Sequence, residues 1–361
     1  METGGANAIL SEVESRIRVW LQDKPAGGNE TLIAEMLQTV LKLAGDNASR
    51  GDLKILNRAL KELRYAFKVF APYRSVRKVS MFGSTRVTEE DPLYRLARAL
   101  GRRLADEGFM VITGAGPGIM QAGHEGAGRE KSFGVNIRLP LAQKANRVIQ
   151  DDAKLVTFRF FFTRKLMFVK EADAFVFFPG GYGTLDELIE VLTLAQTGKS
   201  QLVPILLMDL PDKAYWTRWE SFVRDAMLSR GYVHENELSF FEIVTDPVEA
   251  VETIKRYYSN YHSYRFVRQD LVIRLQREPS DRLIETLNRE FTGILNDGGV
   301  RRTGPLPEEA DEPSTLQLHR LLVHFNRRDF ATLRKMIDVI NRDGGQGRDN
   351  GAAQDRHPEH R

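Results

Sequence analysis

Residues 177–187, FFPGGYGTLDE, combine types and spacing that suit an anion held beside an acid. Gly180, Gly181 and Gly183 follow an apolar run and lead into a helical pattern. Glycines in such a turn let the backbone approach a ligand closely, and the N–H groups at a helix start attract anions. Thr184 and Glu187 come next, so the segment can place a carboxylate beside the molecule that carries the anion.

Two further turns carry residues of a similar kind. FGSTR places Gly83 and Ser84 directly after an apolar run, and TGAGPGIM places Gly114 and Gly116 ahead of Met120. Loops at the carboxyl ends of parallel strands form the ligand crevice of an open sheet. We therefore predict that the three turns lie together, although strand-to-helix turns also use glycine for steric reasons alone.

These turns do not match the common nucleotide motifs. A dinucleotide fingerprint needs G-x-G-x-x-G after the first strand and an acid at the end of the second. Here the triple-glycine turn comes one strand late and the next strand ends in Asn136, Ile137 and Arg138, and no G-x-x-x-x-G-K-[ST] is present. The glycines therefore favour a ligand with a single phosphate, such as a nucleoside monophosphate or a sugar phosphate.

The charged residues near these turns have two interpretations each. Arg164 and Lys165 lie in the aromatic segment FRFFFTRKLMFVK. They either snorkel from an amphipathic helix or supply fixed positive charge to a site. Thr184 to Glu187 also matches a capping box, in which the glutamate bonds the N–H of the cap residue, so Glu187 has a structural interpretation beside the functional one.

The arrangement of elements predicts an α/β fold. Beyond Lys78, short and continuous apolar runs alternate with amphipathic stretches, which is typical of a doubly wound, Rossmann-like parallel sheet with helices on both faces. The expected strands span 79–83, 109–114, 133–139, 154–160, 174–180, 202–208 and 240–245. The expected helices span 92–108, 118–130, 163–172, 184–198 and 247–258.

The flanking segments have other patterns. Two amphipathic helices at 30–43 and 53–70 precede the sheet, and a β-α-β-β-α run after it predicts a small α+β domain. We divide the chain into an N-terminal helical extension (1–77), a Rossmann-like nucleotide-binding catalytic domain (78–260), the small α+β domain (261–343) and a disordered tail (344–361).

Composition restricts the partners and the compartment. The 361 residues carry a net charge of +3, too little to indicate a nucleic-acid partner. No apolar run approaches the roughly 20 residues of a membrane-spanning helix, and the N-terminus lacks a secretion-signal pattern. The chain has no cysteine, which excludes disulfides and thiolate metal sites. We expect a cytoplasmic protein that binds neither nucleic acid nor membrane.

Residues 79–258 resemble the LOG family of nucleotide phosphoribohydrolases, which are often labelled lysine decarboxylases. The signature P-G-G-x-G-T-x-x-E stands at 179–187, and the arginine-lysine pair stands at 164–165. The resemblance implies hydrolysis of a nucleoside 5′-monophosphate to free base and ribose 5-phosphate, with Arg164 and Glu187 catalytic. The residues assigned to substrate binding are Gly83, Ser84, Gly114, Gly116, Met120, Lys165, Gly180, Gly181, Gly183 and Thr184.

This reaction accounts for a carboxylate at Glu187. Cleavage of an N-glycosidic bond develops positive charge on the ribose, so a nearby carboxylate stabilises the transition state and can orient or deprotonate water. Arg164 either positions the ribose and phosphate or balances Glu187. The resemblance also implies a homodimer or higher homo-oligomer and no metal or redox cofactor. No pyridoxal-lysine site of a decarboxylase is recognisable.

Some residues depart from the family pattern. Small plant-type members read His-Glu before the arginine-lysine pair, where this chain has Phe162 and Thr163. We therefore expect AMP or a related monophosphate as the substrate and do not assume a cytokinin nucleotide. The alternative is a non-catalytic carrier or sensor of a nucleotide or other phosphorylated ligand, because similar folds carry molybdenum cofactor. For the C-terminal segment we expect a regulatory or assembly role.

Overall fold

The computed structural model describes residues 12, 15, 16, 19, 29–139 and 144–343. The chain forms two compact units, residues 1–64 and 65–361. The first contains α2 (Glu30–Gly45) and most of α3 (Arg50–Phe70), which confirms the two helices expected before the sheet. The predicted disordered tail lies outside the described residues. No described helix has the length and apolar character needed to cross a membrane.

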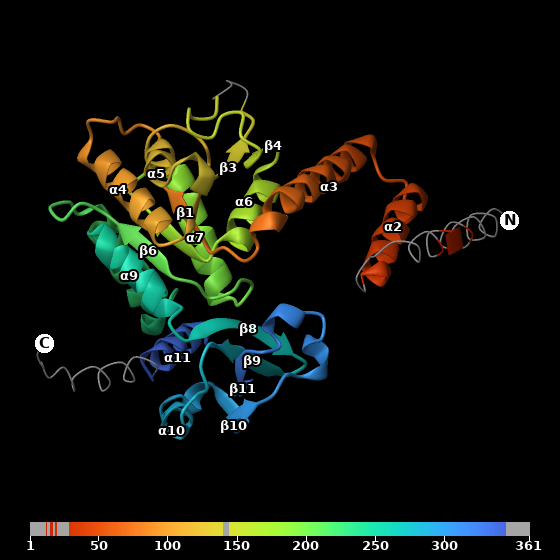
Figure 1. Cartoon of the computed structure of the whole chain (residues 1–361), viewed down its shortest axis with the longest axis vertical. Helices are drawn as coiled ribbons and strands as arrows, with labels where there is room; N and C mark the ends of the chain where they lie inside the picture. The colour runs from red at the N-terminus through yellow and green to blue at the C-terminus, as the bar shows by residue number, and fades with distance from the viewer. Residues whose placement is uncertain (1–11, 13–14, 17–18, 20–28, 140–143, 344–361) are drawn as a thin grey trace, which may run out of the picture. The chain divides into compact units, whose positions relative to one another are not determined.

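A seven-stranded parallel sheet forms the centre of the second unit, as Figure 1 shows. The spatial order of its strands is β4-β3-β2-β1-β5-β6-β7, and every neighbouring pair is parallel. The strands are β1 (Lys78–Phe82), β2 (Met110–Thr113), β3 (Ser132–Ile137), β4 (Leu155–Phe158), β5 (Ala174–Phe177), β6 (Ile205–Met208) and β7 (Phe241–Val244). The predicted doubly wound α/β fold is therefore confirmed.

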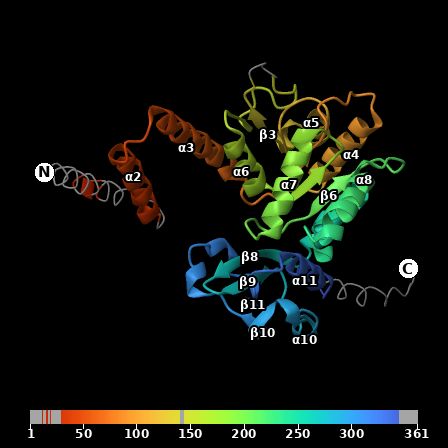
Figure 2. The ribbon, with the colours of Figure 1, turned by 180° about the vertical axis from the view of Figure 1, so that it is seen from behind.

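Helices cover both faces of this sheet because consecutive residues of a strand point to opposite sides. On one face α4 (Pro92–Asp106), α5 (Ile119–Ala127) and α9 (Pro247–Tyr257) share a core with Met81 and its neighbours (Figure 1). On the other face lie α6 (Phe161–Glu171) and α7 (Tyr182–Gln196), and α8 (Tyr215–Phe222) follows β6 (Figure 2). Phe82 contacts Phe168 of α6 there, with ring centres 4.7 Å apart.

The strand order reverses between β1 and β5, which is where open α/β sheets bind ligands. The loops after these strands are joined by a hydrogen bond from Ser84 N to Pro179 O, 3.0 Å long. Ile119 N, at the start of α5, donates to Ser84 O, also at 3.0 Å. The sequence-predicted turns after β1, β2 and β5 therefore lie side by side.

The C-terminal residues form a second, antiparallel sheet with the order β10-β11-β9-β8. Its elements are β8 (Tyr261–Val267), β9 (Asp270–Leu275), α10 (Asp281–Glu290), β10 (Leu295–Thr303), β11 (His319–Phe325) and α11 (Phe330–Asp343). The predicted β-α-β-β-α order was wrong at its start, because it did not include the strand β8 that precedes β9. The buried residues of β8 stand three apart for two reasons. A register shift between Tyr261 and Ser263 separates Tyr261 from Tyr264 in one core, and Val267 packs in a different cluster with Val272 and Leu322, so the strand lacks a two-residue period.

One apolar core joins this antiparallel sheet to the parallel one. It contains Ala195 of α7 and Leu202 together with residues of β8, β9, β11 and α11. Tyr257 of α9 donates a hydrogen bond to Leu202 O at 2.6 Å, and Asn341 of α11 accepts from the N–H of Tyr261 at 2.8 Å. The ends of α7 and α9 are thus fixed against the C-terminal sheet. The boundary at residue 260 stays a prediction.

Candidate active site

A cavity of about 770 Å³ opens at the carboxyl ends of β1, β2, β3 and β5. Its lining includes every residue assigned to the site from the sequence except Lys165, namely Gly83, Ser84, Gly114, Gly116, Met120, Arg164, Gly180, Gly181, Gly183, Thr184 and Glu187. Four separate loops and helices supply these residues, and the sheet brings them together. Their roles in binding and catalysis remain predictions.

Helix α7 begins at Tyr182, two residues before the predicted start, with Gly181 as the N-cap residue. No side chain caps this helix, so the capping-box interpretation of Thr184 and Glu187 is wrong. Thr184 lies in the first turn and Glu187 lies one turn further along. The first N–H groups of a helix have no partner within it, and Tyr182 and Gly183, the first residues of α7, line the cavity. This helix start is therefore suited to an anion.

Neighbouring atoms leave no free space for a Cβ atom at two glycines of the site. A Cβ atom on Gly180 would lie 2.1 Å from Thr184 Oγ1 and 3.1 Å from the carbonyl carbon of Gly83. A Cβ atom on Gly114 would lie 2.4 Å from Arg164 Nη2 and 2.7 Å from Met120 Sδ. The first glycine lets the loops after β1 and β5 touch, and the second leaves room for a guanidinium group.

Arg164 is anchored in the site rather than extended into solvent. Its Nε donates to Val135 O at 2.9 Å, and its guanidinium carbon lies 5.2 Å from the centre of the Phe168 ring. Burial lowers the pKa of Arg164, and the negative charge of Glu187 opposes that shift. The helix α6 thus holds one fixed cation at the ends of β2 and β3.

Glu187 is a buried carboxyl group, with 7% of its side chain exposed. Burial raises its pKa to about 7, against the effect of Lys165 and Arg164, while Glu190 and Asp186 raise it further. Lys165 does not line the cavity. Its Nζ lies 2.5 Å from Glu190 Oε2, 2.9 Å from Asp186 Oδ2 and 3.6 Å from Glu187 Oε2. Lys165 therefore contacts three acids of α7, and it approaches Glu187 from outside the cavity.

Two residues that the sequence analysis missed support the glycine loops. Asn146 Nδ2 donates to Gly116 O at 3.1 Å, and Asn146 N donates to Ala115 O at 2.8 Å. Ala115 has a φ of 62°, a conformation that L residues rarely adopt, so this loop needs such support. Tyr215 of α8 donates from its hydroxyl to Gly180 O at 2.6 Å. Neither residue belongs to a motif, so no local signal marked them.

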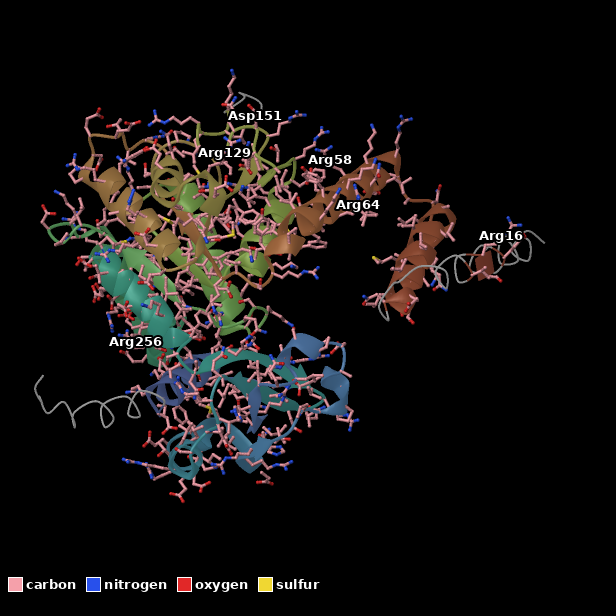
Figure 3. All side chains as sticks on the ribbon, viewed as in Figure 1. Arg16, Arg58, Arg64, Arg129, Asp151 and Arg256 are labelled. Carbon is pink, nitrogen blue, oxygen red and sulfur yellow. The ribbon has the colours of Figure 1, made fainter. Side chains whose placement is uncertain are left out.

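The segment that carries Asn146 is itself held in place. Arg129 lies among the loops near Asp151 (Figure 3), where its Nη2 donates to Gln150 O at 3.0 Å and its Nε lies 2.8 Å from Asp152 Oδ2. His124 contacts Thr113 Oγ1 and Phe133 O, each at 3.0 Å, and burial lowers its pKa to about 4. His124 is therefore a neutral packing residue behind the cavity.

The cavity also has lining residues outside the set assigned to substrate binding. Asn136 and Ile137 of β3 and Phe161 of α6 form part of the wall, and Arg86 lies on the loop after β1. Among the residues that the structure describes, no cluster of three or more His, Asp or Glu side chains is arranged to hold a metal ion.

The family model matches residues within the parallel-sheet region. Residues 118–254 match the family model described as "Possible lysine decarboxylase". A probable cytokinin riboside 5′-monophosphate phosphoribohydrolase of Oryza sativa subsp. japonica is 32% identical over 128 residues, which cover 34% of this chain and 54% of that protein. One from Arabidopsis thaliana is 38% identical over 113 residues, which cover 30% of this chain and 53% of that protein. The chain thus spans about half the length of these two relatives.

Solved structures also resemble about half of this chain. The molybdenum cofactor binding protein from Rippkaea orientalis is 21% identical, and the match covers 50% of this chain and 96% of that one with a TM-score of 0.36.

We predict that Gly114→Ala reduces ligand binding and any turnover by about tenfold or more, because the new methyl group displaces the guanidinium of Arg164 and a misplaced catalytic group is costly. Gly304→Ala is the matched control, since a Cβ atom there has no neighbour within 4 Å. Calorimetric titration with AMP tests this prediction. Equal affinity in the two variants would contradict it.

The pKa of Glu187 also predicts how stability depends on pH. Its pKa is raised on folding from 4.5 to about 7, so the folded state binds the proton more tightly and stability falls as pH rises through that interval. Glu187→Gln removes the charge that is buried above pH 7. The increase in Tm caused by this substitution should therefore be larger at pH 8 than at pH 5. Thermal melts at both pH values measure it, and an equal change in Tm at both would refute the assignment.

Proposed function

We propose that this protein hydrolyses the N-glycosidic bond of a nucleoside 5′-monophosphate, AMP or a related one. The match of residues 118–254 to the family model and the partial similarity to plant cytokinin riboside 5′-monophosphate phosphoribohydrolases support this proposal. The products are free base and ribose 5-phosphate. The observation that carries the proposal is the placement of Glu187, a buried carboxyl that lines the same cavity as Arg164 and as the open start of α7.

The phosphate would bind at the start of α7. Tyr182, Gly183 and Thr184 line the cavity there, so their N–H groups and the Thr184 hydroxyl are the proposed donors, and the helix dipole favours negative charge. Ser84 and Arg86 approach from the neighbouring loop, and Arg86 is exposed with no side-chain partner among the described residues. A single phosphate suits this cradle because it has neither a P-loop lysine nor a dinucleotide fingerprint.

The ribose would then lie beside Glu187, which is three residues after Thr184 on α7, about 4.5 Å along the axis. The C1′–N bond breaks with its electron pair leaving on the base, and a water oxygen adds to C1′. The water proton passes to Glu187 and from there to the departing nitrogen. A pKa near 7 suits a group that both accepts and returns a proton at neutral pH. Arg164 positions the substrate and limits the rise in that pKa.

The base would lie against the part of the cavity wall formed by Met120, Ile137 and Phe161. Asn136 contributes an amide side chain to the same wall. An asparagine amide can accept from adenine N6 and donate to N7 at once, whereas guanine offers only acceptors on that edge. This pairing supports AMP as the preferred substrate.

We predict that the purified protein releases ribose 5-phosphate from AMP faster than from GMP, CMP or UMP. Glu187→Ala and Arg164→Ala should each lower kcat by about 10² to 10³, because each removes an electrostatic contact to the transition state. Circular dichroism of the variants checks that the fold persists. Tight binding of AMP without release of sugar phosphate by the wild-type protein would instead support the carrier or sensor alternative.

We also propose that the protein is a homodimer assembled through α6 and α7. Both helices expose large apolar side chains: Phe161 is 53% exposed, Phe162 55%, Leu166 46% and Ile189 47%. Large apolar side chains exposed on two neighbouring helices support an interaction surface here.

Phe162→Glu should shift sedimentation from dimer to monomer, because a charge placed in a desolvated interface is costly. Phe222→Glu is the matched control, since Phe222 is 58% exposed on α8. A wild-type protein that sediments as a monomer at all concentrations would disprove this assembly.

A further inference from the structure

A second cavity of about 770 Å³ lies where the parallel sheet's helices meet the antiparallel sheet. Its wall comes from the C-terminal halves of α6 and α7, the loop 198–203, and strands β8 and β9. It shares no lining residue with the candidate active site. Its volume falls within the range of about 300–1,000 Å³ that is usual for small-molecule sites. In Figure 2, α7 runs towards the antiparallel sheet at this end.

Cations dominate the charged side chains of this wall. The lining contains Arg77, Lys170, Lys199, Arg265 and Arg274, against the carboxylates of Asp173 and Glu312. Burial lowers the pKa of His262 in the same wall, and the charges of Arg77 and Arg274 lower it further, which is the effect of a positive potential.

Several of these cations have acidic partners, which fix their positions. Arg77 Nη1 lies 3.0 Å from Asp173 Oδ1, and Lys170 Nζ lies 2.6 Å from Glu171 Oε1. Arg265 and Arg274 both pair with Glu312, and also with Asp311 and Glu309, respectively.

Lys199 differs from the others. Within the described part of the chain its ammonium group has no partner, and it is exposed on the loop that follows α7. Lys170 keeps 48% of its side chain exposed. The wall therefore offers the unpaired ammonium group of Lys199 and the accessible one of Lys170, together with arginines that their acidic partners hold in place. This arrangement suits a ligand with several negatively charged oxygens.

The two helices of the wall also carry the catalytic candidates. Lys170 lies six residues after Arg164 on α6, about 9 Å along the axis, and Val191 lies four residues after Glu187 on α7, about 6 Å along the axis. Phe168 of α6 packs against Phe82 of β1, and Ala195 near the end of α7 lies in the apolar core of the antiparallel sheet, so a displacement of either helix at the second cavity would reach the residues of the first. A ligand that favours one position of these helices would change the geometry of the first cavity.

We propose that this second cavity is a regulatory site for a small polyanion of nucleotide size, and that its occupancy alters turnover at the first cavity. The proposal goes beyond the proposed hydrolysis. Binding of a polyanion at the second cavity does not depend on the hydrolase activity, whereas the effect on turnover rests on it. A polyphosphate and a polycarboxylate share the required chemistry, so both are used as probes.

The test is calorimetric titration of the full chain with pyrophosphate, ATP and citrate at low ionic strength, with ribose 5-phosphate present to fill the first cavity. The double variant Lys170→Glu, Lys199→Glu reverses the two accessible charges. Lys213→Glu is the matched control, because that lysine is 60% exposed and lines neither cavity. We expect at least one probe to bind the wild-type protein and the control alike, and to bind the double variant about tenfold or more weakly. Pyrophosphate or ATP as that probe identifies a polyphosphate site, and citrate alone a polycarboxylate site.

Two results overturn the binding half: no probe binds the wild-type protein at millimolar concentration, or the double variant, shown by its melting curve to be folded, binds as the wild type does. The regulatory half has its own readouts. Bound probe should change amide hydrogen exchange in α6 and α7, and should change kcat or KM for AMP in the wild type and not in the double variant. Binding without an exchange change in either helix rejects regulation, even if AMP proves not to be a substrate.

Discussion

The site depends on how closely backbone segments approach one another where the strand order reverses. A Cβ atom on Gly180 would collide with Thr184 Oγ1 and lie only 3.1 Å from the carbonyl carbon of Gly83, and the hydrogen bond from Ser84 N to Pro179 O joins the two loops. Gly118, with a φ of +67°, lets the loop after β2 contact the carbonyl of Ser84. Without these contacts the start of α7 would have no facing wall, and the cavity would not exist.

A second constraint is electrostatic. Burying a carboxyl group without partners favours its neutral form, and two neighbouring acids add to that effect at Glu187. Lys165 and Arg164 oppose it from adjacent positions of one helix, yet they act from different sides, since Arg164 lines the cavity and Lys165 contacts the acids of α7. The balance leaves Glu187 able to change protonation near neutral pH. Such a group lowers stability where it is ionised, which is a common feature of functional sites.

The same two helices connect the cavities of the second unit. Their N-terminal halves carry Arg164 and Glu187, and their C-terminal halves border the space beside β8. The apolar core that unites Ala195 and Leu202 with the antiparallel sheet makes that sheet part of the support of α7. The C-terminal sheet therefore packs against a helix that carries part of the candidate active site. The two regions share an apolar core and are not independently packed domains.

The sequence by itself determined the α/β alternation, the glycine turns and the Arg164 and Glu187 candidates, because these depend on local spacing and residue type. It did not determine where α7 begins, since Thr184 and Glu187 fit a capping box, whereas the helix starts at Tyr182 with Gly181 as its N-cap residue and has no side-chain cap. Nor did it reveal β8, whose bulge hides the two-residue period. The supports at Asn146 and Tyr215, and the position of Lys165 behind Glu187, were decided only by the tertiary structure. Packing brings together residues that are distant in the chain, and no local pattern records such contacts.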